Sequence, residues 1–146
     1  MRIRMRRRVS AVMLCLAMQT MACAAQYGFY LIQQMGRGIN LGNTLEAPYE
    51  GWWDIPAQEY MIEDYANAGF TCLRIPVRWD EHTSDTSPYT IEASWLNRVE
   101  EIVDWALERD LYVVLNAHHD EWIGNFTQTD RDRFAAIWQQ VSYHFR

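Results

Sequence analysis

Two kinds of hydrophobic pattern alternate along the chain from residue 38 onward. Short apolar runs, typical of strands buried on both faces, occupy residues 38–43, 70–77 and 111–115. Apolar residues at helical spacing follow each run, at about residues 54–68, 94–109 and 129–146. Strands that alternate with helices in this way predict an α/β fold with a parallel sheet.

Capping signals set the expected ends of two of these helices. Asp54 is the expected N-cap of the first helix, and Pro56 is tolerated in its first turn. Gly69 is its expected C′ residue, because glycine adopts the left-handed conformation that ends many helices. Thr129 and Asp132 resemble a capping box at the start of the last helix.

The residues before the first strand have the composition of a secretory signal peptide. Five arginines lie within residues 1–8, and a mostly apolar stretch that ends on small residues covers residues 9–25. We therefore expect residues 1–25 to be a signal peptide, residues 26–146 to form the mature domain, and the protein to be secreted. The apolar run is short for a membrane span, so we expect none in the mature form. Lipid attachment at Cys23 is an alternative.

The charge that remains after residue 25 is strongly negative. Eight arginines and no lysine stand against 19 acidic residues, which gives a formal charge of −11. An acidic surface without a basic patch argues against nucleic acid as a partner. Cys72 is the cysteine that remains in the mature domain, so the sequence predicts neither a disulfide framework nor a zinc cluster.

Polar side chains gather where each predicted strand ends. The carboxyl ends of parallel strands share one edge of a sheet, so we expect groups from all three ends to meet. Arg74 is the most informative, because a guanidinium within an apolar strand is costly unless it pairs with a carboxylate, which it would hold ionised. A purely structural ion pair is the alternative. The other members are Asn40, Asn43 and Glu46 after the first strand, Arg78, Trp79 and His82 after the second, and Asn116, His118, His119, Asp120 and Glu121 after the third.

Four tryptophans fall in loops on this same edge. Exposed aromatic rings beside a polar cleft suit stacking on the apolar faces of sugar rings, so four of them together favour a carbohydrate ligand. Each ring taken singly could equally anchor its own loop. The four are Trp52, Trp53, Trp79 and Trp122, whereas Trp95, Trp105 and Trp138 fall on predicted helices.

Other chemistries have weaker support in the sequence. The glycines at 36, 38 and 42 lack the spacing of a nucleotide-binding loop, and the sequence contains no nucleophile elbow around a serine. Residues 118–121 contain histidines and carboxylates without the spacing of a zinc-hydrolase motif. We therefore expect no metal and no other cofactor, with a metal-dependent hydrolase at residues 118–121 as an alternative.

Three motifs, one at each strand end, resemble glycoside hydrolase family 5, and in particular its secreted bacterial endoglucanases. They are G-I-N-L-G-N-T-L-E-A at 38–47, L-R-I-P-V-R-W-D-E-H at 73–82 and V-L-N-A-H-H-D at 114–120. The resemblance implies a (β/α)8 TIM barrel, of which this chain would hold the first three βα units as an N-terminal fragment. It also implies retaining hydrolysis of O-glycosidic bonds in β-1,4-glucans by a protein that is a monomer when full length.

The resemblance carries family roles onto individual residues. Arg74 matches the arginine that holds the nucleophilic carboxylate ionised, and His118 matches a histidine that lines the subsite where the bond is cleaved. Both would support catalysis. The residues implied to bind substrate are Asn43, Glu46, Trp79, His82 and His119.

The sequence lacks the two catalytic carboxylates that the resemblance requires. Retaining glycosidases use two carboxyl groups about 5–5.5 Å apart, and the family carries its acid/base in an Asn-Glu-Pro segment that does not occur here. We therefore expect this chain alone to be inactive and poorly stable. The alternatives are a non-catalytic carbohydrate-binding protein and a hydrolase of another β-glycan, such as mannan or xyloglucan.

Overall fold

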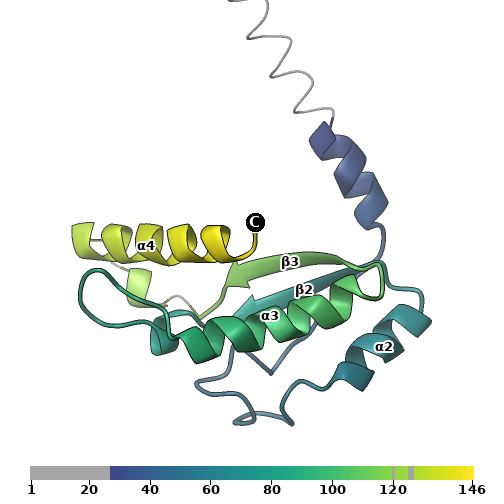
Figure 1. Ribbon diagram of the computed structural model, residues 1–146, viewed down its shortest axis with the longest axis horizontal. Coiled ribbons are helices and arrows are strands. Elements are labelled where there is room, and N and C mark those ends of the chain that lie inside the picture. Colours follow the sequence, from purple (N-terminus) through teal and green to yellow (C-terminus); the bar gives the residue numbers. More distant parts are fainter. Residues whose placement is uncertain (1–26, 120, 125–126) are drawn as a thin grey trace, which may run out of the picture. The chain divides into compact units, whose positions relative to one another are not determined.

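Three parallel strands alternate with helices in the computed structural model, which describes residues 27–119, 121–124 and 127–146 (Figure 1). The sheet has the order β1-β2-β3, and the chain follows that order. The expected α/β fold with a parallel sheet is therefore confirmed. The elements are β1 (Gly38–Asn40), α2 (Glu59–Asn67), β2 (Cys72–Val77), the 3-10 turn η1 (Asp80–His82), α3 (Ala93–Leu107), β3 (Tyr112–Ala117), the 3-10 turn η2 (Glu121–Ile123) and α4 (Gln128–His144).

Residues 27–36 belong to a different unit from residues 37–146. Residues 27–35 of this unit are helical. The expected signal peptide lies outside the described residues. Over the part of the chain that the structure describes, no helix combines the length and the apolar character needed to cross a membrane.

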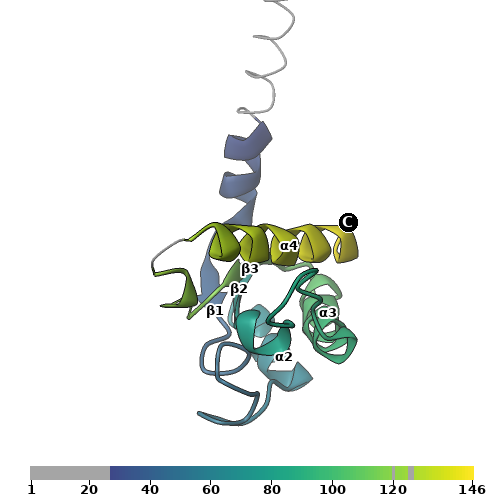
Figure 2. The ribbon, with the colours of Figure 1, turned by 90° about the vertical axis from the view of Figure 1, so that its left-hand side faces the viewer.

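The register of the sheet sorts its side chains onto two faces. Leu73 pairs with Ile39 and Val113, and Leu73, Ile75 and Val77 are fully buried in the core. Helices α2 and α3 lie side by side, and α3 packs on β3 (Figure 2). The helices contribute to this core Ile62 from α2, Val99, Ile102 and Ala106 from α3, and Ile137 and Val141 from α4.

The opposite face of the sheet carries the polar residues. Asn40, Arg74 and Val114 pair across the three strands, so their side chains lie in one row on this face. Asn116, two residues beyond Val114, lies on the same face of β3 and pairs with Pro76. The strand thus continues two residues past the predicted apolar run, because Asn116 and Ala117 still pair with β2.

Helix α2 begins at Glu59, and its N-cap lies four residues later than expected. Residues 55–58 are not helical, and Gln58 has an extended conformation at the N-cap position. The prediction of Asp54 as N-cap was wrong because Pro56 disfavours a helical conformation at the residue before it. Asp54 instead accepts a hydrogen bond from the N–H of Ile55 at 2.8 Å. The other end is confirmed, since Gly69 follows the helix with φ of 82°.

The N-cap of helix α4 is Thr127, two residues earlier than the expected Thr129. The Thr127 hydroxyl accepts from the N–H of Asp130, and the Asp130 carboxylate accepts from the N–H of Thr127 at 2.7 Å. This is a capping box, whereas Thr129 and Asp132 lie inside the helix. The sequence contains Thr-x-x-Asp twice, two residues apart, and the upstream copy is the cap.

Candidate active site

Arg74 and His118 meet at the carboxyl edge of the sheet. Arg74 Nη1 donates to Asn40 Oδ1 at 3.3 Å, and Arg74 Nη2 lies 3.4 Å from His118 Nδ1. The pairing of β1 with β2 places Asn40 beside Arg74. The N–H of His118 donates to Val77 O at 2.9 Å, so this residue extends the hydrogen bonding between β2 and β3 by one step. The structure therefore brings together groups from all three strand ends.

The guanidinium of Arg74 contacts neutral groups. Among the described residues no carboxylate oxygen lies within ion-pair distance of it, and its polar contacts are an amide oxygen and an imidazole nitrogen. Its side chain is only partly buried. A fixed positive charge at this position would lower the pKa of any carboxyl group placed beside it and favour the ionised form.

The contacts of His118 favour the tautomer that carries its proton on Nε2. The groups within hydrogen-bond reach of Nδ1 are Arg74 Nη2 and, at 3.3 Å, Asn116 Nδ2. Both are donors, so Nδ1 acts as the acceptor and the proton resides on Nε2. The Nε2–H group is then available to donate a hydrogen bond to a ligand.

The ring of His119 contacts two other aromatic rings of the site, those of His118 and Trp53. Its ring centroid lies 4.7 Å from that of His118 and 5.2 Å from that of Trp53, and both contacts are edge-on. Its backbone has a positive φ of 54°. Glu121 Oε1 lies 3.6 Å from His119 Nδ1. A hydrogen bond from its own backbone N–H and, to a lesser extent, His119 hold the pKa of Glu121 below its ordinary value.

Glu46 and Asn43 shape the loop that follows β1. Glu46 is 5% exposed, and its two carboxylate oxygens accept from the N–H groups of Asn43 at 2.6 Å and Thr44 at 2.9 Å. Asn43 is exposed and has a positive φ of 63°. Arg78 Nε donates to Glu46 O at 3.2 Å. The carboxylate is thus committed to the loop backbone, and the substrate contact implied for it stays a prediction.

Trp79 and His82 are engaged within the protein. Trp79 is 2% exposed and donates its indole N–H to Asn116 O at 3.3 Å, so the expectation of an exposed ring here was wrong. His82 stacks on Trp95 with ring centroids 3.7 Å apart, and its Nδ1 lies 3.4 Å from Glu92 Oε2. The structure does not bring His82 to Arg74, and the substrate-binding roles of Trp79 and His82 stay predictions.

The remaining loop tryptophans differ in exposure. Trp52 is 57% exposed and Trp53 is 44% exposed, so both rings can meet a ligand. Trp122 is partly buried, and the guanidinium of Arg133 lies 5.1 Å above its ring.

Asp80 is a titratable group that sequence reasoning missed. Burial raises the pKa of its carboxyl group above the ordinary value, and its Oδ1 atom is buried without a hydrogen-bond partner among the described residues. Arg133 Nη2 donates to Asp80 O at 2.8 Å, which ties η1 to α4. Nothing in the local sequence distinguishes Asp80 from a solvated loop aspartate, because its burial depends on the packing of α4.

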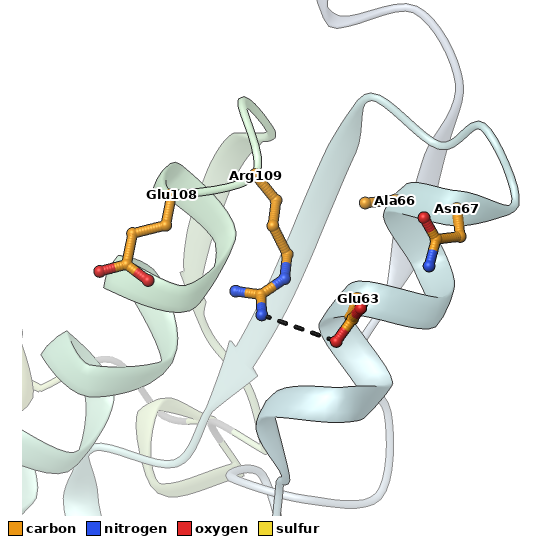
Figure 3. Close-up of a pocket in the computed structure, with 5 residues that line it drawn as sticks. All are labelled: Glu63, Ala66, Asn67, Glu108 and Arg109. Atoms are coloured by element: carbon orange, nitrogen blue, oxygen red, sulfur yellow. Dashed lines mark ion pairs between the residues drawn. The ribbon is translucent and has the colours of Figure 1, made fainter.

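A groove of about 370 Å³ lies at the other end of the sheet (Figure 3). It lies between the last turns of α2 and α3, which lead into the amino ends of β2 and β3. Arg109 Nη2 spans it, 2.7 Å from Glu59 Oε1 and 4.0 Å from Glu63 Oε2. The groove is therefore distinct from the Arg74–His118 edge.

Throughout the described residues, no group of three or more histidine, cysteine or acidic side chains is arranged to hold a metal ion.

Comparisons with known proteins agree with the motifs at the strand ends. The family model "Cellulase (glycosyl hydrolase family 5)" matches residues 33–146. Endoglucanase H of Acetivibrio thermocellus is 49% identical over 118 residues, which are 81% of this chain and 13% of that protein.

Solved structures give the same result. A tri-modular subfamily 4 endo-β-1,4-glucanase from Bacillus licheniformis, complexed with cellotetraose, is 47% identical with a TM-score of 0.74 over 79% of this chain and 24% of that chain. Cel5A of Thermotoga maritima, in complex with cellobiose, is 40% identical with a TM-score of 0.74 over 77% of this chain and 37% of that one. This chain thus spans well under half the length of the relatives it matches, and its three βα units match part of their TIM barrels. The chain belongs to glycosyl hydrolase family 5, the cellulase family.

Proposed function

We propose that this chain forms the sugar-contacting side of a glycosidase site that hydrolyses O-glycosidic bonds in β-1,4-glucans with retention. The observation that carries the proposal is the pairing of Arg74 with His118 and Asn40, which leaves a cation at the carboxyl edge without a carboxylate partner among the described residues. The endoglucanase names of the relatives and the cellobiose and cellotetraose in their structures support β-glucan as the substrate.

Each of the site residues has a distinct role in this proposal. Arg74 would hold the nucleophilic carboxylate ionised and fix its orientation, because the two charges attract. His118 would donate its Nε2–H to a sugar hydroxyl at the cleaved bond. His119 and Trp53 would offer an aromatic wall to the apolar face of a sugar ring.

We further propose that the 146-residue chain has no hydrolytic activity by itself. Retention requires a nucleophile and a general acid about 5–5.5 Å apart. At the described part of this edge, Glu46 has both oxygens committed to backbone N–H groups, and the lowered pKa of Glu121 makes it a poor proton donor. Neither carboxyl group therefore suits the role of the general acid. We also propose that the protein is secreted after removal of residues 1–25.

Binding and turnover of a soluble mixed-linkage β-glucan test both proposals. In native electrophoresis, the purified chain should migrate more slowly when the gel contains the glucan. His118→Ala should reduce this retardation. His144→Ala is the matched control, because His144 lies on α4 and pairs with Glu100. Migration unaffected by glucan would contradict the sugar-contacting role.

A reducing-sugar assay on the same preparation decides the second proposal. We expect no release above that of a buffer blank. Sustained release that disappears in Arg74→Met would contradict the inactivity of the chain. Chelator-sensitive release would instead favour the metal-dependent alternative.

A further inference from the structure

The loop between β1 and α2 presents its aromatic rings to solvent on a long stretch of irregular chain. Residues 41–58 connect the two elements, and Tyr49, Trp52 and Trp53 are all exposed. Tyr49 and Trp52 contact edge-on at 4.7 Å, whereas Trp53 contacts His119 at 5.2 Å. An irregular loop loses conformational entropy when it adopts one shape, so something must hold Trp53 against His119.

An arginine from α3 holds this loop from the side. Arg98 Nε donates to Glu50 Oε2 at 2.9 Å and Nη2 donates to Glu50 Oε1 at 2.8 Å, which is a two-pronged ion pair. Arg98 Nη2 also donates to Ala57 O at 2.7 Å, and the N–H of Ala57 donates to Glu50 Oε1 at 2.8 Å. The side chains of Arg98 and Glu50 are only 22% and 16% exposed. Solvent therefore screens this pair less than an ordinary surface ion pair.

The contacts of Arg98 close the loop on itself. Glu50 and Ala57 flank Trp52 and Trp53 in the sequence, and the arginine joins the two flanks at one point. Gly51 turns the chain with φ of 91°, and a Cβ atom there would lie 3.4 Å from Pro56 Cγ. Residues 50–57 thus form a closed loop whose two ends are fixed to α3 by Arg98.

We propose that the Arg98–Glu50 pair is a positioning device for the sugar site: it fixes residues 50–57 so that Trp53 stands against His119, and thereby strengthens glucan binding. Arg98 lies on α3 and acts through Trp53 without meeting the ligand. The effect on glucan binding rests on the proposed function, whereas the effect on the Trp53–His119 contact does not.

Glu101 offers a matched control for Glu50. It is the other carboxylate partner of Arg98, but it lies on α3 one turn away and is 52% exposed. Glu50→Gln removes a charge from the loop, and Glu101→Gln removes the same charge from the helix. Only the first should release Trp53. Arg98→Lys is a second variant, because lysine keeps the charge but cannot make the two-pronged contact.

The first measurement is the NMR signal of the His119 ring in the full chain labelled at histidine. Trp53→Ala sets the size of the ring-current effect of Trp53 on that signal. We expect Glu50→Gln and Arg98→Lys to shift the signal in the same direction as Trp53→Ala, and Glu101→Gln to leave it unchanged. A wild-type His119 signal in Glu50→Gln would overturn the proposal. Circular dichroism identifies any variant that fails to fold, and Arg98→Lys then decides the result.

The second measurement is the dissociation constant for cellotetraose by titration calorimetry. Loss of an aromatic contact should weaken binding about threefold to tenfold in Glu50→Gln and leave Glu101→Gln at the wild-type value. Equal binding by all variants, together with a shifted His119 signal, would overturn the link to glucan affinity. Absence of binding by the wild type would refute the proposed function, and the His119 signal would still decide whether the pair positions Trp53.

Discussion

Glu46→Ala provides the sharpest test of what the loop after β1 needs from this carboxylate. The substitution removes both acceptors of the N–H groups of Asn43 and Thr44. Thr44 is buried, so its N–H would lose its partner without gaining water, whereas Asn43 is exposed and its N–H can be solvated. We therefore expect the loop to lose stability before the sheet does.

The magnitude follows from these two hydrogen bonds. Hydrogen bonds to a charged group contribute about 1.5–3 kcal/mol each, and an unsatisfied buried donor costs about 1–3 kcal/mol. Solvation of the Asn43 N–H and relief from burying the Glu46 charge reduce the sum. We expect Glu46→Ala to lower the free energy of unfolding by about 2–4 kcal/mol. Glu46→Gln should cost less, because it retains one acceptor oxygen.

Urea unfolding followed by tryptophan fluorescence measures the effect. With a slope of about 2 kcal/mol per molar urea, the midpoint should fall by about 1–2 M in Glu46→Ala. Glu81→Ala is the control, because its side chain is 53% exposed and lies 3.8 Å from Arg78. That variant should change the free energy by less than about 0.5 kcal/mol. A change in Glu46→Ala as small as in the control would refute the role of the carboxylate in the loop.

Three further predictions concern burial and capping. Asp80→Asn should raise the thermal midpoint at pH 7, because burial raises the pKa of Asp80 in the folded state. The cost to folding grows as the pH rises from the ordinary pKa of an aspartate to the raised one, so the advantage of the variant should vanish near about pH 3, where the group is protonated in both states. Cys72 is buried and burial raises the pKa of its thiol, so a chain without residues 1–25 should react with a thiol reagent at pH 8 only after urea unfolds it, and fast labelling of the native state would contradict this. Thr127→Ala should lose about 1 kcal/mol of stability in urea unfolding and Thr129→Ala almost none, and equal losses would contradict the observed cap.

The strands could be predicted from sequence because buried parallel strands leave a short continuous apolar run. Helix boundaries were less accessible. The start of α2 depended on how Pro56 and the residues around it continue an extended loop, and two overlapping Thr-x-x-Asp motifs offered the same cap in two registers. Such alternatives differ by about 1 kcal/mol locally, so the packing of the helix decides between them.

The candidate site was predictable only in part, for a related reason. Arg74 and His118 could be placed together because strand pairing carries both to one edge of the sheet. The sequence did not show which side chains in the loops are buried and which are exposed. Trp79 and Trp53 are both tryptophans in a segment between a strand and the next helix, yet one is buried and the other is exposed. The difference depends on the path of each loop, which for Trp53 is set by a contact to Glu50 from a helix 48 residues away in sequence.

The distribution of charge explains why Arg74 has no carboxylate partner among the described residues of so acidic a chain. Arg98 and Arg109, which lie on or just after α3, pair with carboxylates of α2, α3 and the loop before α2. Arg74 is on the opposite face of the sheet, where Asn40 and His118 offer it neutral acceptors. The Arg74 side chain is only partly buried, so water still solvates part of its charge. A bound sugar would exclude that water without supplying an opposite charge. The unbalanced charge of Arg74 therefore favours a carboxylate beside it in the working site, which is the group that the proposed reaction requires as its nucleophile.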